Sequence, residues 1–463
     1  MIKVKSKYFL NKLYEALNTI QSERTPQLIS VSAPIEHLNV FGFYQAGAHY
    51  AGSRSFWMNA DRSLTLVGVG SAYTIEAKSD RFKAIETEWS KILEDADIHN
   101  QSDVPGTGPV LLGGFSFDPN RTGSEKWSNF PDSKFSVPMF LLTEYQEQSY
   151  LTVNVLVQKE DHLEQLYAHL TQEMNHLLEH DLYKEVKPTV TGTQEINPSQ
   201  WKETVHKATM QIREGFMDKV VLARELKAQF SHPCSVATLL ESVTEQQPQS
   251  FVFAIESGGD CFFGATPERL VKVNQGEVLS TCLAGTAPRG ETLAEDEQLG
   301  QDLLHDQKNL QEHEFVVQMI RKAIESCSTD VEIPAGPVLY PLRNVQHLYT
   351  PVKGNLKQGS SLLSVVERLH PTPALGGFPR AEAMSFIRAE EDMDRGWYAA
   401  PVGWLDGKSN GEFGVAIRSA LLSENEAYLY AGCGIVADSD PEAEYEETAI
   451  KFSPMLHVLG GSQ

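Results

Sequence analysis

The sequence predicts an α+β protein in which large antiparallel sheets pack face to face and helices lie outside them. Three observations support this fold class. Short β-rich runs occur in both halves of the chain, glycine-bearing turns join neighbouring runs, and amphipathic stretches lie between them. Because strands joined by tight turns pair in an antiparallel way, the core is expected to be rich in antiparallel strands.

Length and composition indicate a globular protein with a substantial core. Of its 463 residues, 41% are hydrophobic and 22% are charged, which argues against disorder. The 39 basic and 62 acidic side chains give a net charge of −23. This charge opposes attraction to nucleic acid or to an anionic membrane surface. An anionic substrate would therefore need locally concentrated positive charge.

The sequence also predicts a cytoplasmic protein. The N-terminus has no compact apolar segment with a small-residue cleavage site, and no run approaches the ~18 apolar residues of a membrane-spanning helix. The five cysteines are scattered and form no CxxC pair, so neither a disulfide framework nor a zinc site is predicted.

One polar stretch, 184–199, divides the chain into unequal parts, because it contains turn formers and no hydrophobic periodicity. We expect a single unit over 1–463, composed of a sheet-rich N-terminal half, 1–184, and a C-terminal half, 197–463.

In the N-terminal half, the runs SLTLVGVG, PVLLGGFSFDP and SYLTVNVLVQ predict strands, and helical spacing of apolar residues predicts helices at 82–93 and 162–178.

The C-terminal half begins with a predicted helix that has Asn197 as its cap. A strand is predicted over 219–230. Two hairpins follow: FVFAIES with CFFG around the turn GGD, and LVKV with EVLSTCLAGT around NQG. Helices are predicted over 299–323 and 441–456, with Asp440 as the cap of the second.

Glu312 is an unusual carboxylate, because it lies four residues before Val316 and eight before Ile320 and so shares an apolar helical stripe. Burial of a carboxylate is costly without a cation or hydrogen-bond donors. The spacing leaves two alternatives, a buried ion pair with Lys308 or a metal ligand. On the last helix, Glu444, Glu447 and Lys451 share one face, which from spacing alone is interpreted as solvated.

Two residues are candidates for acid–base chemistry. Lys219 precedes three apolar strand residues, and a desolvated lysine can act as a base near neutral pH. A lysine at a strand edge that extends to solvent is the commoner case. Glu268, in GATPERL, could remain protonated beside apolar walls and act as an acid. A glutamate in an exposed turn would have the same sequence pattern.

His347, Tyr398, Arg418 and the glycines of LAGT and AGCG are further candidates for substrate binding. Arg418 could form a forked pair with a carboxylate, and glycine lets backbone N–H groups approach an anion. Packing, an interstrand ion pair and turn geometry explain these residues equally well. The sequence contains no Walker loop, dinucleotide-binding glycine motif, HExxH or GxSxG.

Eight segments, read in order, resemble the chorismate-utilising enzymes. They are KVVLARE, FFGATPERL, LAGTAPRG, KNLQEHEFVV, HPTPALGG, PVGW, AIRSALL and AGCGIVADSDPEAEYEETAIK, and they cover nearly the whole C-terminal half. In the N-terminal half only stretches such as LLGGFSFDP resemble the family. The family contains isochorismate, salicylate, anthranilate and aminodeoxychorismate synthases, and the resemblance implies the fold of anthranilate synthase component I.

The resemblance implies a Mg²⁺ site formed by Glu312 and Glu447, with Glu444 close to the metal. For the last helix this replaces the interpretation as a solvated face. Tyr398 and Arg418 would hold the enolpyruvyl carboxylate of chorismate. The ring carboxylate would bind the metal near backbone groups, and the other residues lining the pocket would be Gly285, Thr286, His347, Gly432 and Lys451.

The reaction that these roles imply is addition of water at C2 of chorismate with loss of the C4 hydroxyl. Lys219 would deprotonate the water, Glu268 would protonate the leaving hydroxyl, and magnesium would draw electron density toward the ring carboxylate. The resemblance therefore implies an isochorismate synthase, an isomerase. The alternative is a salicylate synthase, which continues to eliminate pyruvate.

Particular positions distinguish the members of the family. Lys219 is typical of members that use water, and Ala284 stands where aminodeoxychorismate synthases have a lysine. Ala374 stands where members with lyase activity tend to carry threonine. These residues favour isochorismate as the final product, and no glutaminase subunit is expected. The long N-terminal half resembles enzymes of the menaquinone branch. Asn309 and Ala287 depart from the family pattern, at positions where an acidic residue and an arginine are frequent.

Overall fold

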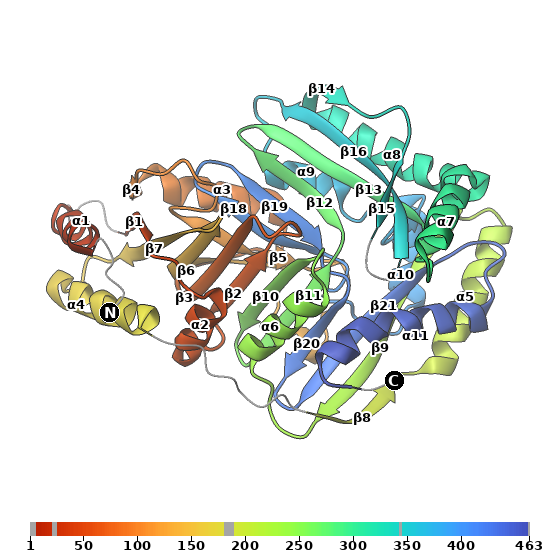
Figure 1. Ribbon diagram of the computed structural model, residues 1–463, viewed down its shortest axis with the longest axis horizontal. Coiled ribbons are helices and arrows are strands. Elements are labelled where there is room, and N and C mark those ends of the chain that lie inside the picture. Colours follow the sequence, from red (N-terminus) through yellow and green to blue (C-terminus); the bar gives the residue numbers. More distant parts are fainter. Residues whose placement is uncertain (1–5, 21–25, 180–188, 342–344, 462–463) are drawn as a thin grey trace.

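Two series of β-strands, each with strands from both halves of the chain, form the centre of the molecule (Figure 1). The computed structural model describes residues 6–20, 26–179, 189–341 and 345–461. Within these ranges every strand pairing is antiparallel except one, between the first and fourth strands. The predicted fold class, large antiparallel sheets with helices outside, is confirmed.

The first series runs across the lower part of Figure 1. In order of pairing, its strands are β4 (Asp97–Asn100), β1 (Gln27–Ile35), β7 (Gln148–Val157), β6 (Ser133–Tyr145), β3 (Leu64–Glu76), β2 (Arg54–Met58), β10 (Phe251–Ser257), β11 (Asp260–Thr266), β20 (Ser419–Ser423), β21 (Glu426–Ile435), β9 (Lys219–Phe230) and β8 (Val190–Glu195).

The second series begins on β6, whose residues 133–136 pair with β5 while residues 140–145 pair with β7. In order of pairing, its strands are β5 (Val110–Phe115), β18 (Pro401–Asp406), β19 (Gly411–Val415), β12 (Arg269–Asn274), β13 (Glu277–Pro288) and β16 (Val345–Leu356), with β14 (Ser328–Glu332) and β15 (Val338–Pro341) on β16. The short strand β17 (Gly377–Phe378) pairs with the start of β9.

Alternate residues of the first series face two separate hydrophobic clusters, as the two-residue period of a strand requires. On β10, Phe253 belongs to the cluster that also contains Trp404 and Phe413 of the second series. Its neighbours Val252 and Ala254 belong to the other cluster. Because one cluster contains residues of both series, the two sheet layers pack against each other.

Helices cover the outer surfaces of these layers (Figure 1). The cluster containing Val252 is closed by α1 (Ser6–Asn18), α2 (Val40–Ala46), α4 (Leu163–Leu178), α6 (Val236–Gln246) and α11 (Pro441–Val458). The cluster containing Phe253 includes side chains of α3 (Arg81–Glu94), α5 (Pro198–Arg213), α8 (Gln307–Cys327), α9 (Leu362–Leu369) and α10 (Arg380–Glu390). Helix α7 (Leu293–His305) precedes α8. In the described ranges, no helix is both long and apolar enough to cross a membrane.

Most predicted elements are present, and both predicted hairpins are confirmed as β10–β11 and β12–β13. The predicted helix over 299–323 is wrong, because Asp306 interrupts it. Asp306 has extended backbone angles, and its Oδ1 accepts a hydrogen bond from the backbone N of Asn309 at 2.7 Å. Its carboxylate thereby ends one helix and caps the next.

The stretch predicted as a boundary, 184–199, differs in part from the prediction. Residues 184–188 lie outside the described residues. The following residues form β8, a strand at the edge of the sheet that pairs with β9. Because its side chains are mostly exposed, β8 shows no alternation of apolar and polar residues and was not predicted. Asn197 precedes α5, yet its side chain makes no capping bond and instead donates to Asp392 at 2.6 Å. Asp440 does cap α11, as predicted, by accepting from the backbone of Glu442 and Ala443.

Candidate active site

An ion pair between β9 and α8 forms the first part of the candidate site. Lys219, the first residue of β9, donates from Nζ to Oε1 of Glu312 at 2.6 Å. The predicted burial of Glu312 is wrong, because its side chain is 45% exposed. The buried stripe of α8 includes the next residue, His313, together with Val317. The ion-pair partner of Glu312 is Lys219 rather than Lys308.

A second ion pair lies on α11. Lys451 donates from Nζ to Oε1 of Glu447, one turn earlier, and to the backbone carbonyl of Gly432 at 2.9 Å. The side chain of Glu447 is half exposed, which agrees with the interpretation of this face from spacing alone. Contact of Lys451 with β21 nevertheless ties the charged face to the strand beneath it.

Two glycines of AGCG form a bare strip of backbone between these ion pairs. Gly432 and Gly434 lie two residues apart on β21 and therefore on the same face, about 7 Å apart. A Cβ added to Gly434 would lie 2.6 Å from Cε of Lys219, and one added to Gly432 would lie 3.4 Å from Oη of Tyr398. The absence of a side chain at Gly434 is what allows Lys219 to lie across this strand, whereas Tyr398 lies at ordinary contact distance from Gly432.

The Gly285–Thr286 segment forms a β-bulge on β13. Ala284 pairs with Leu348 and Thr286 with His347, so Gly285 is an extra residue without a partner on β16. Its φ is +79°, a conformation that glycine adopts without strain. The bulge interrupts the regular pairing of β13 with β16 beside α8, since a Cβ added to Gly285 would lie 3.3 Å from Cβ of Asn309.

His347 is held in its neutral form at the same bulge. Its Nδ1 lies 2.9 Å from Oγ1 of Thr286. Burial lowers the pKa of His347, and the nearby positive charges of Arg418 and Lys451 lower it further, although a backbone hydrogen bond to Gly285 opposes them. A neutral imidazole lines the site without adding to its charge.

Arg418 supplies a positive charge with no fixed partner. Among the described residues its guanidinium makes no hydrogen bond or ion pair. Burial lowers the pKa of Arg418, while Tyr398, Glu447 and Glu268 raise it. A half-buried guanidinium without an ion-pair partner is suited to bind a carboxylate through a forked pair.

Tyr398 completes this anion site as a hydrogen-bond donor. Burial raises the pKa of Tyr398 to about 12, so its phenol remains protonated at neutral pH. Its ring stacks on Tyr430 with the centroids 5.2 Å apart, which fixes the direction of the hydroxyl.

Glu268 has the properties of a general acid. It lies between β11 and β12, and burial raises its pKa to about 7, although the positive charge of Arg418 lowers it. No group in the described part of the chain hydrogen-bonds its carboxyl group. Its backbone is held at both sides, since its N–H donates to Oγ1 of Thr266 and its carbonyl accepts from Val415.

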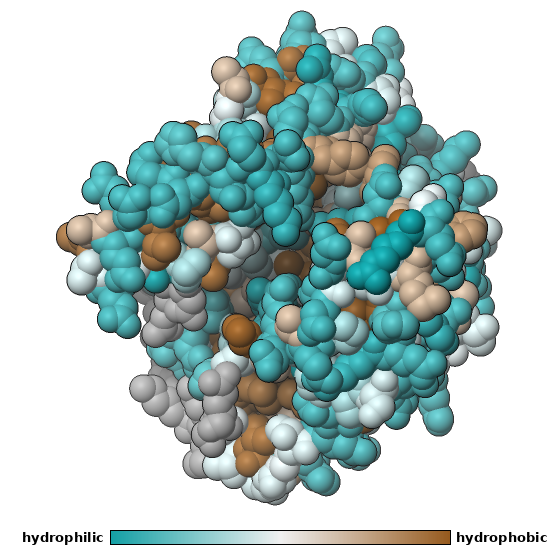
Figure 2. Space-filling view, turned by 90° about the vertical axis from the view of Figure 1, so that its right-hand side faces the viewer, coloured by the Kyte–Doolittle hydropathy of each residue, from teal (hydrophilic) through white to brown (hydrophobic). Residues whose placement is uncertain are grey.

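These electrostatic interactions bring five of the predicted residues into one neighbourhood. The pKa of Arg418 depends on Glu447 and Glu268, and that of His347 depends on Arg418 and Lys451. The residues come from α11, β16 and the ends of β11 and β20, which are far apart in the sequence. The face of the molecule that carries α5, α7 and α11 is hollowed near its centre, with hydrophobic residues inside a hydrophilic rim (Figure 2).

Ala374 lies in the turn between α9 and β17, which is tied to the start of β9. Within this turn Leu375 and Gly376 donate to the carbonyl of Thr372, and the carbonyl of Gly376 accepts from Val221 at 3.1 Å. The backbone of Phe378 pairs with Lys219. Ala374 is therefore close in the fold to the proposed base, although no contact joins their side chains.

The proposed metal ligands do not form a preorganised metal site. In the described ranges no group of three or more His, Cys, Asp or Glu residues could hold a metal ion. Glu312 and Glu447 are each paired with a lysine, and Oε1 of Glu444 accepts from Ser439 at 2.6 Å. Their oxygen donors still fit Mg²⁺, which commonly uses one or two protein carboxylates and completes its octahedron with water and substrate.

Two buried interactions that support the site were missed by the sequence analysis. His313, 2% exposed, bonds to the carbonyl of Ala284 at 3.0 Å and to Oγ1 of Thr350 at 2.7 Å, which fixes α8 next to the Gly285 bulge. The available signal was its position on the apolar stripe of α8. Arg395 and Glu391 also form a buried pair, spaced at i, i+4. This pair bonds to backbone groups of β9 and of the Ala374 turn, at Val221, Ala223 and Leu375.

Comparison with known proteins gives matches over the whole chain. The family described as "Chorismate binding enzyme" matches residues 15–460. Isochorismate synthase MenF of Bacillus subtilis is 41% identical over 100% of both chains. The salicylate biosynthesis isochorismate synthase of Pseudomonas aeruginosa is 37% identical over 96% of this chain and 94% of its own. The structure of MenF, the menaquinone-specific isochorismate synthase of Escherichia coli, has a TM-score of 0.82 and covers 99% of this chain and 100% of that one; at 24% identity it shows the shared fold.

Proposed function

Because the chain belongs to the family of chorismate-binding enzymes, we propose that it is an isochorismate synthase, which isomerises chorismate to isochorismate. The observation that carries this proposal is the pair formed by Glu268 and Arg418. A carboxyl group with a pKa of about 7 lies near a half-buried guanidinium that has no hydrogen-bond partner among the described residues. Such a pair can bind a carboxylate and donate a proton next to it.

Arg418 and Tyr398 are proposed to bind the enolpyruvyl carboxylate of chorismate. The guanidinium can donate two parallel hydrogen bonds to it, and the protonated phenol can donate a third. Stacking on Tyr430 holds the ring of Tyr398, so its phenol loses little freedom on binding. The ring carboxylate is proposed to lie over the glycine strip of β21, near the bulge at Gly285 and Thr286. His347 and Lys451 would line the same space.

The reaction balances without any reagent other than water. Lys219, as the free amine, takes a proton from water, and the hydroxide adds to C2 of the ring. The double bonds shift, the C4–O bond breaks, and the Glu268 carboxyl donates its proton to the leaving hydroxyl, which departs as water. Because only the free amine is a base, Lys219 must leave its ion pair with Glu312 and release its proton to solvent before each turnover.

Mg²⁺ is the proposed cofactor, held by Glu312 and Glu447 with Glu444 nearby. When bound, it would polarise the ring carboxylate and favour addition of a nucleophile to the ring. The lysines that now neutralise these carboxylates would be free to face the substrate.

The menaquinone branch, a cytoplasmic location and action without a glutaminase subunit are part of the same proposal. Similarity to the B. subtilis MenF protein over the full length supports the menaquinone branch. All five cysteines are free thiols, which supports a cytoplasmic location, because a reducing compartment keeps thiols reduced. Ala284 and Lys219 support action without a glutaminase subunit, since they favour water over ammonia as the nucleophile.

The test is product analysis of the purified protein with chorismate and MgCl₂. We expect isochorismate to accumulate, and we expect Lys219→Ala and Glu268→Gln to abolish its formation. Salicylate and pyruvate formed without an added lyase would establish the alternative, a salicylate synthase. Anthranilate formed in ammonium buffer would contradict the choice of nucleophile. Unchanged turnover in either variant would refute the assigned acid and base.

A further inference from the structure

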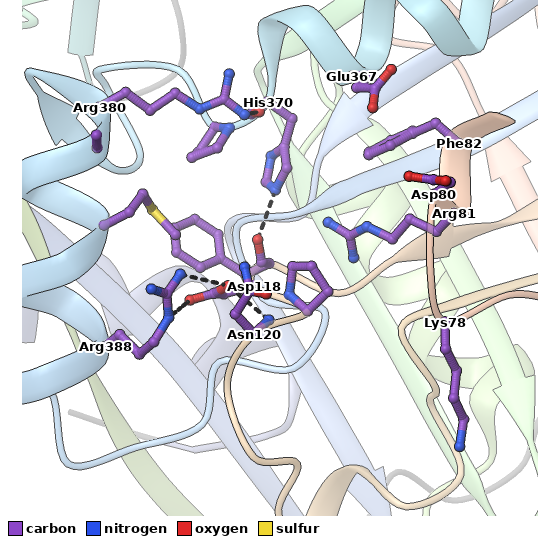
Figure 3. Close-up of a pocket in the computed structure, with 15 residues that line it drawn as sticks. Lys78, Asp80, Arg81, Phe82, Asp118, Asn120, Glu367, His370, Arg380 and Arg388 are labelled. Carbon is purple, nitrogen blue, oxygen red and sulfur yellow. Dashed lines mark hydrogen bonds and ion pairs between the residues drawn. The ribbon is translucent and has the colours of Figure 1, made fainter.

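A cavity of about 660 Å³ lies between the two halves of the chain, away from the residues proposed for catalysis (Figure 3). None of those residues lines it. Its walls come from the segment that begins α3, the loop after β5, the end of α9 and the start of α10. Its lining includes Arg81, Phe82, Phe117, Pro371, Arg380 and Met384.

Arg81 is a buried cation without a carboxylate partner. The residue is only 6% exposed, and its guanidinium points into the cavity in Figure 3. Its Nη1 donates to the carbonyl and hydroxyl of Ser116 and to the backbone carbonyl of Asp132, at 2.7 to 2.9 Å. No carboxylate of the described residues lies within ion-pair distance of it. Burial lowers the pKa of Arg81 to about 10, although the negative charges of Asp132, Asp118 and Glu367 raise it.

A second cation on the cavity wall also lacks a counter-ion. Arg380 donates from its guanidinium to the backbone carbonyls of His370 and Arg368, and desolvation lowers its pKa. The carboxylate of Asp118 is already used, because it forms a two-point pair with Arg388. Two other carboxylates line the cavity, Asp80 and Glu367, and both residues are exposed.

The rest of the wall is apolar and partly aromatic. Phe82 and Phe117 contribute ring faces, and Pro371 and Met384 contribute aliphatic surface. The imidazole of His370 lies edge to face with Phe117, with 5.5 Å between centroids. Burial lowers the pKa of His370 to about 3, so this ring adds apolar surface rather than charge. A flat apolar body with one negative end matches these walls.

We propose that this cavity is a second ligand site, which binds an aromatic carboxylate with its acid group toward Arg81 and Arg380. A carboxylate there would accept charge-assisted hydrogen bonds from guanidinium groups that have only neutral acceptors in the structure. The ring would lie among Phe82, Phe117 and Met384. The site is separate from the one that binds chorismate and would be occupied independently of turnover.

Isothermal titration of the full-length protein with 2-naphthoate tests the proposal. Met384→Trp should fill the cavity without removing a hydrogen bond, and Arg380→Gln should remove a charge from its wall. We expect roughly tenfold or greater weakening of binding in each variant, in Arg380→Gln because a hydrogen bond to a charged group contributes about this much and in Met384→Trp because the indole occupies the space of the ligand ring. Arg321→Gln is the matched control, since Arg321 pairs with Glu325 on α8 and does not line the cavity.

The neutral analogue 2-naphthamide should not bind, because it lacks the charge that Arg81 and Arg380 require. Arg81 itself is left intact in the test, since its side chain holds backbone carbonyls. If Met384→Trp fails to fold, Arg380→Gln still decides the outcome. Absence of 2-naphthoate binding to the wild-type protein at millimolar concentration would overturn the proposal, as would equal affinity in the folded Met384→Trp or Arg380→Gln variant.

Discussion

Replacement of Glu268 by glutamine is expected to abolish activity and, at alkaline pH, to stabilise the fold. Activity should fall because glutamine cannot donate a proton to the leaving hydroxyl, and loss of a general acid typically costs about 10²- to 10⁴-fold in rate. In the wild-type protein kcat/KM should fall as the pH rises through about 7, where Glu268 loses its proton. Glu268→Gln should lack this limb of the profile.

The stability effect follows from the raised pKa of the same group. Burial raises the pKa of Glu268 from 4.5 to about 7. A raised pKa means that the folded state holds the proton more tightly than the unfolded state does. The stability that protonated Glu268 contributes is therefore complete below pH 4.5 and is lost as the pH rises through about 7. At about 1.4 kcal/mol per pH unit, the charged carboxylate costs at most about 3.5 kcal/mol at pH 8.5, an upper limit because the residue is partly accessible to water. The neutral amide avoids this cost.

Urea unfolding at pH 5.5 and at pH 8.5 measures the difference. The unfolding midpoint of Glu268→Gln relative to wild type should be higher at pH 8.5 than at pH 5.5, whereas Glu424→Gln, in the exposed turn between β20 and β21, should show no such change. If the difference between Glu268→Gln and wild type does not vary with pH, the proposed desolvation of Glu268 is refuted. An active Glu268→Gln would refute its role as the acid.

Three further changes have distinct expected outcomes. Gly285→Ala should destabilise the protein by about 1–2 kcal/mol in chemical unfolding, because alanine is strained at a φ of +79°; unchanged stability would contradict the bulge geometry. Glu391→Gln should lower the free energy of unfolding by about 3–5 kcal/mol, because Arg395 would remain buried without its counter-ion; a loss below 1 kcal/mol would mean that water reaches the pair. Glu447→Gln should raise the Mg²⁺ concentration needed for half-maximal activity roughly tenfold or more, while Glu446→Gln, on the exposed side of α11, should leave it unchanged.

Much of the fold could be predicted from local patterns in the sequence. The two hairpins, the strand that begins at Lys219 and the capping of α11 by Asp440 depend on residues close together in the chain. Turn geometry and capping bonds form within a few residues, so their signals are readable without knowledge of distant partners.

Structural features that depend on distant segments could not be predicted from local sequence. The predicted burial of Glu312 was wrong although Val316 and Ile320 of the same stripe are buried, because helical spacing does not show which residue of the first turns is covered by the neighbouring strands. His313 takes the buried position through bonds to Ala284 and Thr350. The shared sheets of the two halves could not be predicted either, since the pairing of β5 with β18 joins residues 110 and 406.

The sequence by itself determined which chemical groups this protein has, their order and the family to which it belongs. Only the tertiary structure decided their electrostatic state. A pKa of about 7 for Glu268, an unpaired guanidinium at Arg418 and the lysine partners of Glu312 and Glu447 all arise where distant strands and helices meet. Desolvation and charge pairing depend on three-dimensional distance, which the spacing of residues along a chain does not specify.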